Sequence, residues 1–197
     1  MASFSSDHPG ERRAVIPPLR LPAARDVLRH VRPRYAAALA VALPLVAIVF
    51  ARFGASGRAL VAAFFVSCLA VLSAIDIAER RLPNRIVLPS AALVFAAQTA
   101  LFPDRALEWA LAAAGASLFL LVPLLVSSAA VGMGDVKLAL LLGAALGSAV
   151  VTAFVLASVA AGVYALALIA RYGLDARRRT IPLGPFLAAG AVAALLL

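Results

Sequence analysis

Two aspartates, Asp76 and Asp135, each lie at the end of a long apolar run of the sequence. A carboxylate at the edge of hydrocarbon is costly, so it normally faces a partner or a watery cavity. Two carboxyl groups at one depth suit hydrolysis of a peptide bond, in which one group takes a proton from water and the other polarises the carbonyl. Because like charges repel, one of the two groups would stay protonated, and the pair would titrate as a unit.

Glycines and a lysine surround the second aspartate, in the sequence Gly-Met-Gly-Asp-Val-Lys-Leu over residues 132–138. Gly132 and Gly134 allow unusual backbone angles and let another chain approach closely. Backbone that leaves helical geometry near a membrane must line a cavity or be buried. We therefore expect both glycines to lie beside a cleft with room for an extended substrate. Lys137 does not share a helix face with Asp135, so we expect it to reach lipid headgroups or to bind the substrate.

Taken singly, these residues also have structural interpretations. Asp76 is compatible with a solvated acid at a helix end, near Arg80 and Arg81. Asp135 is compatible with a helix N-cap, a position where a carboxylate accepts a backbone N–H, and this role does not exclude catalysis. The two glycines are compatible with a plain turn or with close packing between helices.

Several other polar and small residues are interpreted as structural only. Pro83 is expected to break the chain before the next helix, and Asn84 to cap that helix. A Pro-Leu-Gly-Pro stretch at residues 182–185 is expected to set the entry to the last helix. Cys68 lies within an apolar run, where a lone cysteine packs as a small apolar side chain.

The elements that must position the two aspartates follow from the composition. The chain has 197 residues, of which 64% are hydrophobic, and its mean hydropathy is +1.03. Soluble domains are usually nearer half apolar. The excess forms long runs with the charged residues between them, which is typical of membrane helices. The sequence therefore predicts an all-α fold, a polytopic membrane helix bundle of about six to seven transmembrane helices.

Seven apolar segments are candidate spans. Hydrocarbon thickness asks for roughly 20 residues per helix, so the third, fifth and seventh segments are marginal. The predicted spans cover residues 35–50, 59–75, 86–101, 106–126, 136–146, 149–170 and 183–197. A break at Gly147 and Ser148 separates the fifth from the sixth. A polar loop is expected over residues 76–85, and a basic loop over 171–180.

Two regions are predicted along the chain. Residues 1–34 are polar and rich in proline and arginine, which predicts a mobile basic tail, with a short interfacial helix over residues 23–31. Residues 35–197 form the transmembrane domain. The tail has no early apolar core and does not read as a cleavable signal peptide.

The positive charges predict the orientation of the spans. If the N-terminus is cytoplasmic and the spans alternate, only Arg52, Arg58 and Arg105 of the 18 lysines and arginines fall on the outer side. This bias follows the positive-inside rule. It predicts that the N-terminus, Asp76 and Asp135 face the cytoplasm. The net charge of +9 is then explained by orientation and anionic headgroups of the lipid bilayer, and no nucleic-acid partner is expected.

Three motifs resemble those of the type IV prepilin peptidases, in the family's order. The first is Asp-Ile-Ala-Glu-Arg-Arg-Leu-Pro-Asn from residue 76, similar to the family's aspartate followed by a Leu/Ile-Pro-Asn/Asp element. The second, over residues 132–138, resembles Gly-X-Gly-Asp-X-Lys-Leu. The third, Ile-Pro-Leu-Gly-Pro-Phe-Leu over 181–187, is similar to a late Pro-X-Gly-Pro-Phe element.

The resemblance implies a membrane aspartic peptidase that cuts the short basic leader from prepilins or pseudopilins at the cytoplasmic face. Its catalytic acids would be Asp76 and Asp135. The mechanism needs no metal and no organic cofactor, and components of pilus or secretion assembly are further partners that the resemblance suggests.

The chain departs from the larger family members, which carry a cysteine-containing cytoplasmic loop and also methylate the new N-terminus. Its only cysteine is Cys68, within a predicted span. We therefore expect peptidase activity without N-methylation, as in short members of tight-adherence pilus systems.

Two other functions are kept as alternatives. A small ion-coupled transporter would use the two acids as a relay, although no internal repeat supports it. A degenerate family member would serve as an assembly scaffold.

Overall fold

The computed structural model of the chain describes residues 24–126, 132–173 and 182–197. Within these ranges all regular structure is helical, which confirms the predicted all-α class. In chain order the α-helices are α1 (Ala24–Phe53), α2 (Gly57–Glu79), α3 (Asn84–Leu101), α4 (Ala106–Val126), α5 (Met133–Leu146), α6 (Val150–Tyr172) and α7 (Gly184–Leu196). Two short 3-10 turns, η1 (Pro103–Arg105) and η2 (Gly147–Ala149), precede α4 and α6.

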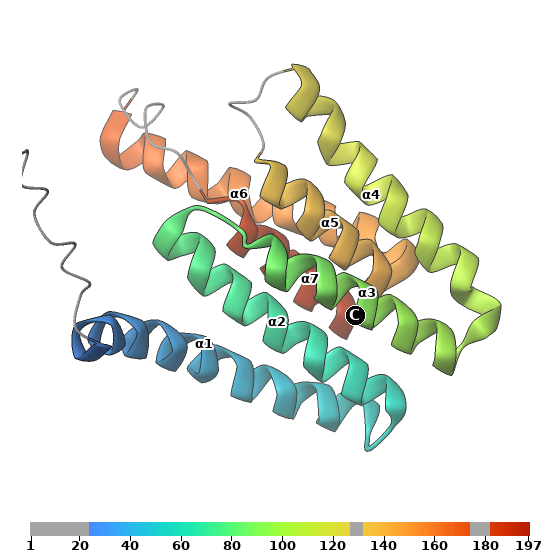
Figure 1. Cartoon of the computed structure of the whole chain (residues 1–197). Helices are drawn as coiled ribbons and strands as arrows, with labels where there is room; N and C mark the ends of the chain where they lie inside the picture. The colour runs from blue at the N-terminus through green and yellow to red at the C-terminus, as the bar shows by residue number, and fades with distance from the viewer. Residues whose placement is uncertain (1–23, 127–131, 174–181) are drawn as a thin grey trace, which may run out of the picture.

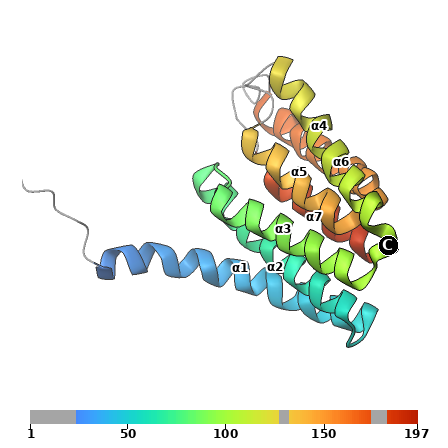
Figure 2. The ribbon, with the colours of Figure 1, turned by 45° about the vertical axis from the view of Figure 1, so that its right-hand side comes forward.

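Helix α5 occupies the centre of the bundle. It packs against α4, α3 and α7 (Figure 1), and most of its side chains are buried. Helix α1 lies at one edge and packs on α2, whereas α6 packs mainly on α7 (Figures 1 and 2). The outer helices expose large apolar side chains such as Leu43, Leu118 and Val163. An apolar exterior is what a bilayer solvates, so this surface fits a membrane protein.

Close approach of the helices depends on small residues. A Cβ atom at Gly143 would collide with the backbone of Ala112 and Ala113 in α4. A Cβ atom at Gly190 would likewise collide with the backbone of α6. Since lipid tails are as apolar as the helix surfaces, such close packing is a main source of association between membrane helices.

Two side-chain hydrogen bonds also hold α5 in place. The Gln98 Nε2 of α3 donates to the carbonyl oxygen of Ala145 over 2.9 Å. The Ser117 hydroxyl of α4 donates to the carbonyl oxygen of Val136 over 3.1 Å. Polar bonds of this kind fix the register of neighbouring helices in an apolar surrounding.

Four helical segments are long and apolar enough to cross a membrane: Ala36–Phe53, Gly57–Glu79, Pro103–Val126 and Met133–Tyr172. The last segment contains α5, η2 and α6. Gly147, at φ 59°, ends α5 there, which confirms the predicted break, and α6 then runs back along the bundle (Figure 1). Helix α7 is apolar but shorter. The chain is therefore a polytopic membrane protein, and a total of six to seven spans stays a prediction.

The predicted loop over residues 76–85 is too long. Helix α2 continues through Asp76 to Glu79, and α3 already begins at Asn84. The N–H of Arg80 still donates to the carbonyl oxygen of Asp76 over 2.8 Å. Arg80 then adopts φ 50°, a left-handed conformation that ends the helix. The apolar run stops at the first charged residue, but the backbone hydrogen bonds continue for another turn.

Other predicted limits also change. Helix α1 is one continuous helix from Ala24 to Phe53, so the separate short helix predicted over residues 23–31 is wrong. Helix α3 has Pro83 at its N-cap position and no side-chain capping bond, so Asn84 is not its cap. Helix α6 extends through Arg171 to Tyr172. The rest of the predicted basic loop, including the arginines at 177–179, and most of the predicted tail lie outside the described residues.

Candidate active site

The three sequence motifs meet at one end of the bundle. The last turn of α2, the first turn of α5 and the first turn of α7 lie close together there (Figures 1 and 2). The connections between α1 and α2, α3 and α4, and α5 and α6 lie at the opposite end (Figure 1). Segments that are far apart in the sequence therefore contribute to one region.

Asp76 is a buried acid in the last turn of α2, with 7% of its surface exposed. Its Oδ2 accepts the backbone N–H of Gly184 over 3.1 Å. This N–H is at the start of α7, where the unpaired N–H groups of a helix carry partial positive charge and stabilise an anion. A Cβ atom at position 184 would come within 2.6 Å of the same oxygen. The segment at 182–185 therefore contributes to the site as well as starting α7.

Asp135 lies in the first turn of α5 and is half-buried. Gly132 occupies the N-cap position, and its N–H donates to the Oδ2 of Asp135 over 3.3 Å. The interpretation of Asp135 as the N-cap itself is therefore wrong. Its carboxylate reaches back from the third helical position, as the acidic residue of a capping box does.

The structure brings Asp76 and Asp135 within electrostatic range of each other. Their helices, α2 and α5, share few direct contacts, but each packs against both α3 and α7. The sequence alone did not show that the two acids meet. Among the described residues, no three His, Cys, Asp or Glu side chains gather in a way that could hold a metal ion.

The other residues predicted for the site have partners within the chain. The Lys137 Nζ donates to the Asn84 Oδ1 over 2.8 Å. At Gly134, a Cβ atom would come within 3.0 Å of the Cβ of Leu82. Leu82 and Asn84 belong to the Leu-Pro-Asn element, which was noticed in the sequence but interpreted as structural. Sequence reasoning missed their contact with the second motif because the lysine and asparagine are 53 positions apart.

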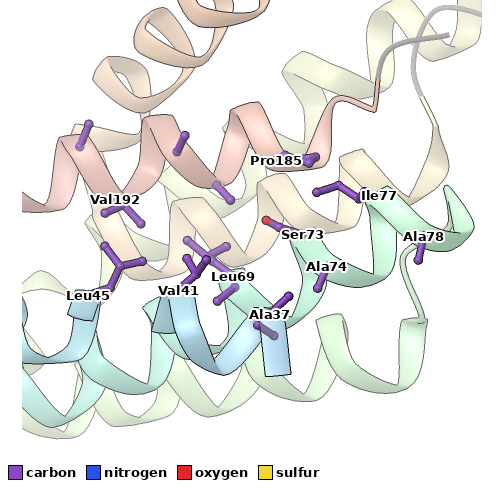
Figure 3. A pocket seen from close by; sticks show the side chains of 15 residues that line it. Ala37, Val41, Leu45, Leu69, Ser73, Ala74, Ile77, Ala78, Pro185 and Val192 are labelled. Carbon is purple, nitrogen blue, oxygen red and sulfur yellow. The ribbon is translucent and has the colours of Figure 1, made fainter. Parts of the chain in front are cut away.

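An apolar hollow of about 740 Å³ adjoins the turn that carries Asp76. It lies between α1, α2 and α7, and Figure 3 shows side chains of all three helices around it. Ser73 and Ile77 of α2 and Pro185 of α7 line the part nearest to Asp76 and Gly184. Alanines make up about half of the lining, which leaves space for another apolar segment close to the helix backbones.

Comparison with known proteins agrees with these motifs. The sequence profile described as the type IV leader peptidase family matches residues 63–167, which include both aspartates. The prepilin leader peptidase/N-methyltransferase of Bacillus subtilis (strain 168) is 33% identical over 162 residues, or 82% of this chain. The chain covers 65% of that relative, less than two thirds of its length. No solved structure matches the chain significantly. The profile match extends over more than half of the sequence, so the chain belongs to the type IV leader peptidase family.

Proposed function

We propose that this protein is a membrane aspartic endopeptidase that removes the basic leader from type IV prepilins or pseudopilins. The observation that carries the proposal is the proximity of Asp76 and Asp135 at one end of an apolar bundle. Family membership supports the reaction class. The name of the Bacillus subtilis relative supports the substrate class.

In the proposed mechanism the two carboxyl groups share one proton. The ionised carboxylate takes a proton from water while the water oxygen attacks the scissile carbonyl carbon. The protonated carboxyl group donates a hydrogen bond to the carbonyl oxygen as negative charge develops there. The tetrahedral intermediate then collapses, the C–N bond breaks, and the leaving amine takes a proton from one of the two groups. No step of this mechanism requires a metal or an organic cofactor.

The surroundings of the pair fit this chemistry. Asp76 is held by the N–H of Gly184, and Asp135 by the N–H of Gly132. Each carboxylate therefore keeps its second oxygen for water or substrate, which agrees with the preorganisation that catalysis needs. The exposed Gly132 is proposed to line the path of the substrate backbone. For Gly134 and Lys137, direct binding of the substrate stays a prediction.

We further propose that the hollow between α1, α2 and α7 receives the apolar segment of the substrate next to the scissile bond. Its continuity with the turn of Asp76 supports this role. A transmembrane segment of the substrate has to remain in an apolar surrounding while its end enters the site.

The active site is proposed to face the cytoplasm from a bacterial inner membrane. Arg80, Arg81, Arg85 and Lys137 lie at the end of the bundle that holds the two aspartates, whereas Arg52, Arg58 and Arg105 lie at the other. The positive-inside rule assigns the first end, together with the basic N-terminal segment, to the cytoplasm.

The protein is proposed to lack N-methyltransferase activity. The name of the Bacillus subtilis relative includes that activity, but about a third of that relative has no match in this chain. The single cysteine of this chain, Cys68, lies in α2 and is partly buried against the Ser90 hydroxyl. A cysteine-containing cytoplasmic loop of the kind found in larger members therefore has no counterpart in this sequence.

The decisive experiment is cleavage of a coexpressed prepilin by the wild type, Asp76→Asn and Asp135→Asn. Each substitution keeps the side-chain size but removes the acid, so we expect cleavage to fall by at least about 100-fold. Mass spectrometry of the product should show an unmethylated N-terminus. Cleavage that persists in either variant contradicts the aspartic mechanism. If no well-folded form cleaves several prepilins, a scaffold is favoured, and acid-dependent ion flux in proteoliposomes would favour the transporter.

A further inference from the structure

Two contacts join the segment from the α2–α3 connection to the first residue of α3 with the N-terminal part of α5. The backbone of Gly134 lies against the Leu82 side chain, where a Cβ atom would be only 3.0 Å from the Leu82 Cβ. Three residues further on, the Lys137 ammonium donates to the Asn84 Oδ1 over 2.8 Å. These contacts lie on either side of Asp135 in the sequence, and the connection itself begins four residues after Asp76. We call the two contacts together the clasp.

The clasp bridges the two helices that carry the aspartates. The two helices that carry the aspartates share few direct contacts, so their own packing does not fix the distance between the carboxyl groups. The connection at residues 80–83 starts at the end of α2 and touches the first turn of α5. It therefore runs from the end of the helix that carries Asp76 to the first turn of the helix that carries Asp135.

We propose that Asn84 and Lys137 are positioning residues that hold Asp135 at its working distance from Asp76. This inference rests on the proposed function and names residues that control the geometry of that site. The absence of a side chain at Gly134 lets the α2–α3 connection approach α5 closely. The Asn84–Lys137 hydrogen bond then fixes the alignment of α3 with α5. This hydrogen bond is exposed to solvent, but its charged donor makes it stronger than a bond between two neutral groups.

The clasp predicts a different phenotype from substrate binding by Lys137. A residue that binds the substrate equally in the ground and transition states changes KM, whereas misplacement of a catalytic acid lowers kcat. Asn84→Ala removes the acceptor but leaves the lysine free to bind a substrate. We expect this variant to lose on the order of 10- to 100-fold in kcat with KM nearly unchanged, because small misplacements of catalytic groups have effects of this size.

The test measures kcat and KM for prepilin cleavage by the purified full chain carrying Asn84→Ala, Lys137→Met, or both. The double variant should be no slower than the slower single variant, because both changes break one contact. Asn84→Asp keeps an oxygen that can accept from Lys137 and should restore most of the activity. Arg85→Met is the matched control, since it removes a neighbouring positive charge but keeps the hydrogen bond, and it should behave like the wild type.

A readout that does not depend on activity tests the contact itself. In a Cys68→Ala background, Leu82→Cys combined with Gly134→Cys should form a disulfide on mild oxidation. A Cβ atom at position 134 would lie 3.0 Å from the Leu82 Cβ, so a local shift of about 0.5 Å gives the separation that a disulfide needs. Disulfide formation tests the contact even if Asn84→Ala fails to fold. If no disulfide forms, the clasp is overturned.

Three results separate the clasp from the proposed function. Wild-type rates in Asn84→Ala, with both aspartate variants inactive, would overturn the clasp and leave the peptidase assignment intact. A raised KM with unchanged kcat in Lys137→Met would also overturn it, in favour of substrate binding. Cleavage that survives loss of either aspartate would instead overturn the proposed function on which the clasp rests.

Discussion

The carboxylate of Asp76 is held by the N–H of Gly184, 108 residues further along the chain. At the scale of single residues, this contact needs both a free backbone donor and the absence of a side chain. A buried carboxylate without such a partner would carry a large desolvation cost. The sequence shows the glycine, which looks like an ordinary helix-start residue near Pro182 and Pro185, but it does not show that its N–H lies against Asp76.

Substitution of Gly184 by alanine should therefore impair the site without unfolding the protein. The added Cβ would come within 2.6 Å of the Asp76 Oδ2, so the carboxylate must move, and we expect cleavage to slow by about 10- to 100-fold. The measurement is kcat for prepilin cleavage, together with the thermal unfolding midpoint in detergent.

Two controls isolate the contact with Asp76. Gly115→Ala adds a Cβ in open space on α4 and should leave kcat unchanged. An alanine before Pro185 is also disfavoured in helical geometry, so the comparison is repeated in a Pro185→Ala background. If Gly184→Ala is as active as its background in both cases, the hydrogen bond to Asp76 has no catalytic importance.

At the scale of the helices, the apolar runs of the sequence show where the helices lie. They do not show where backbone hydrogen bonding begins and ends each helix. The predicted fourth span coincides with α4, because its apolar run is bounded on both sides. The fifth span was predicted to start at residue 136, but α5 begins at Met133. Its polar first turn continues the helical hydrogen bonds beyond the apolar run, and this shift converts Asp135 from an apparent N-cap to the third helical position.

The residues of the candidate site were likewise predicted only in part from the sequence. Asp76 and Asp135 were chosen as candidates because carboxyl groups beside apolar runs are conspicuous, and their catalytic role stays a prediction. The partners Asn84 and Gly184 were missed in these roles, because their contacts depend on how α3, α5 and α7 pack together. Packing between distant segments is a tertiary property that single-sequence periodicity does not contain.

The hollow between α1, α2 and α7 is a feature of helix packing with a testable role. Ala189→Phe places a ring on an exposed lining position of α7. If the substrate's apolar segment occupies the hollow, we expect KM for a prepilin to rise by about 10-fold or more, since the ring removes that binding surface. Val159→Phe, at an exposed position of α6, is the matched control. An unchanged KM in Ala189→Phe would exclude this route for the substrate.

At the scale of the whole molecule, the two ends of the bundle differ in what they hold. One end holds Asp76, Asp135 and the connection with Arg80 and Arg81. At the other end Glu108 accepts hydrogen bonds from Arg105 and Ser148, and this ties the start of α4 to η2. The acid at that end thus joins helices. At the first end, Asp76 is buried and Asp135 half-buried, whereas the neighbouring Glu79 is exposed.

Cysteine labelling can measure which end of the bundle faces the cytoplasm. In a Cys68→Ala background, a cysteine at Ser56 reports the turn between α1 and α2, and a cysteine at Arg81 reports the turn beside Asp76. The positive-inside rule predicts that a membrane-impermeant maleimide labels Ser56→Cys in intact cells and labels Arg81→Cys only after permeabilisation. A leader on the cytoplasmic side of a prepilin could be cut only with this orientation. The reverse labelling pattern would separate the aspartates from such a substrate, even if both acids proved essential for hydrolysis in detergent.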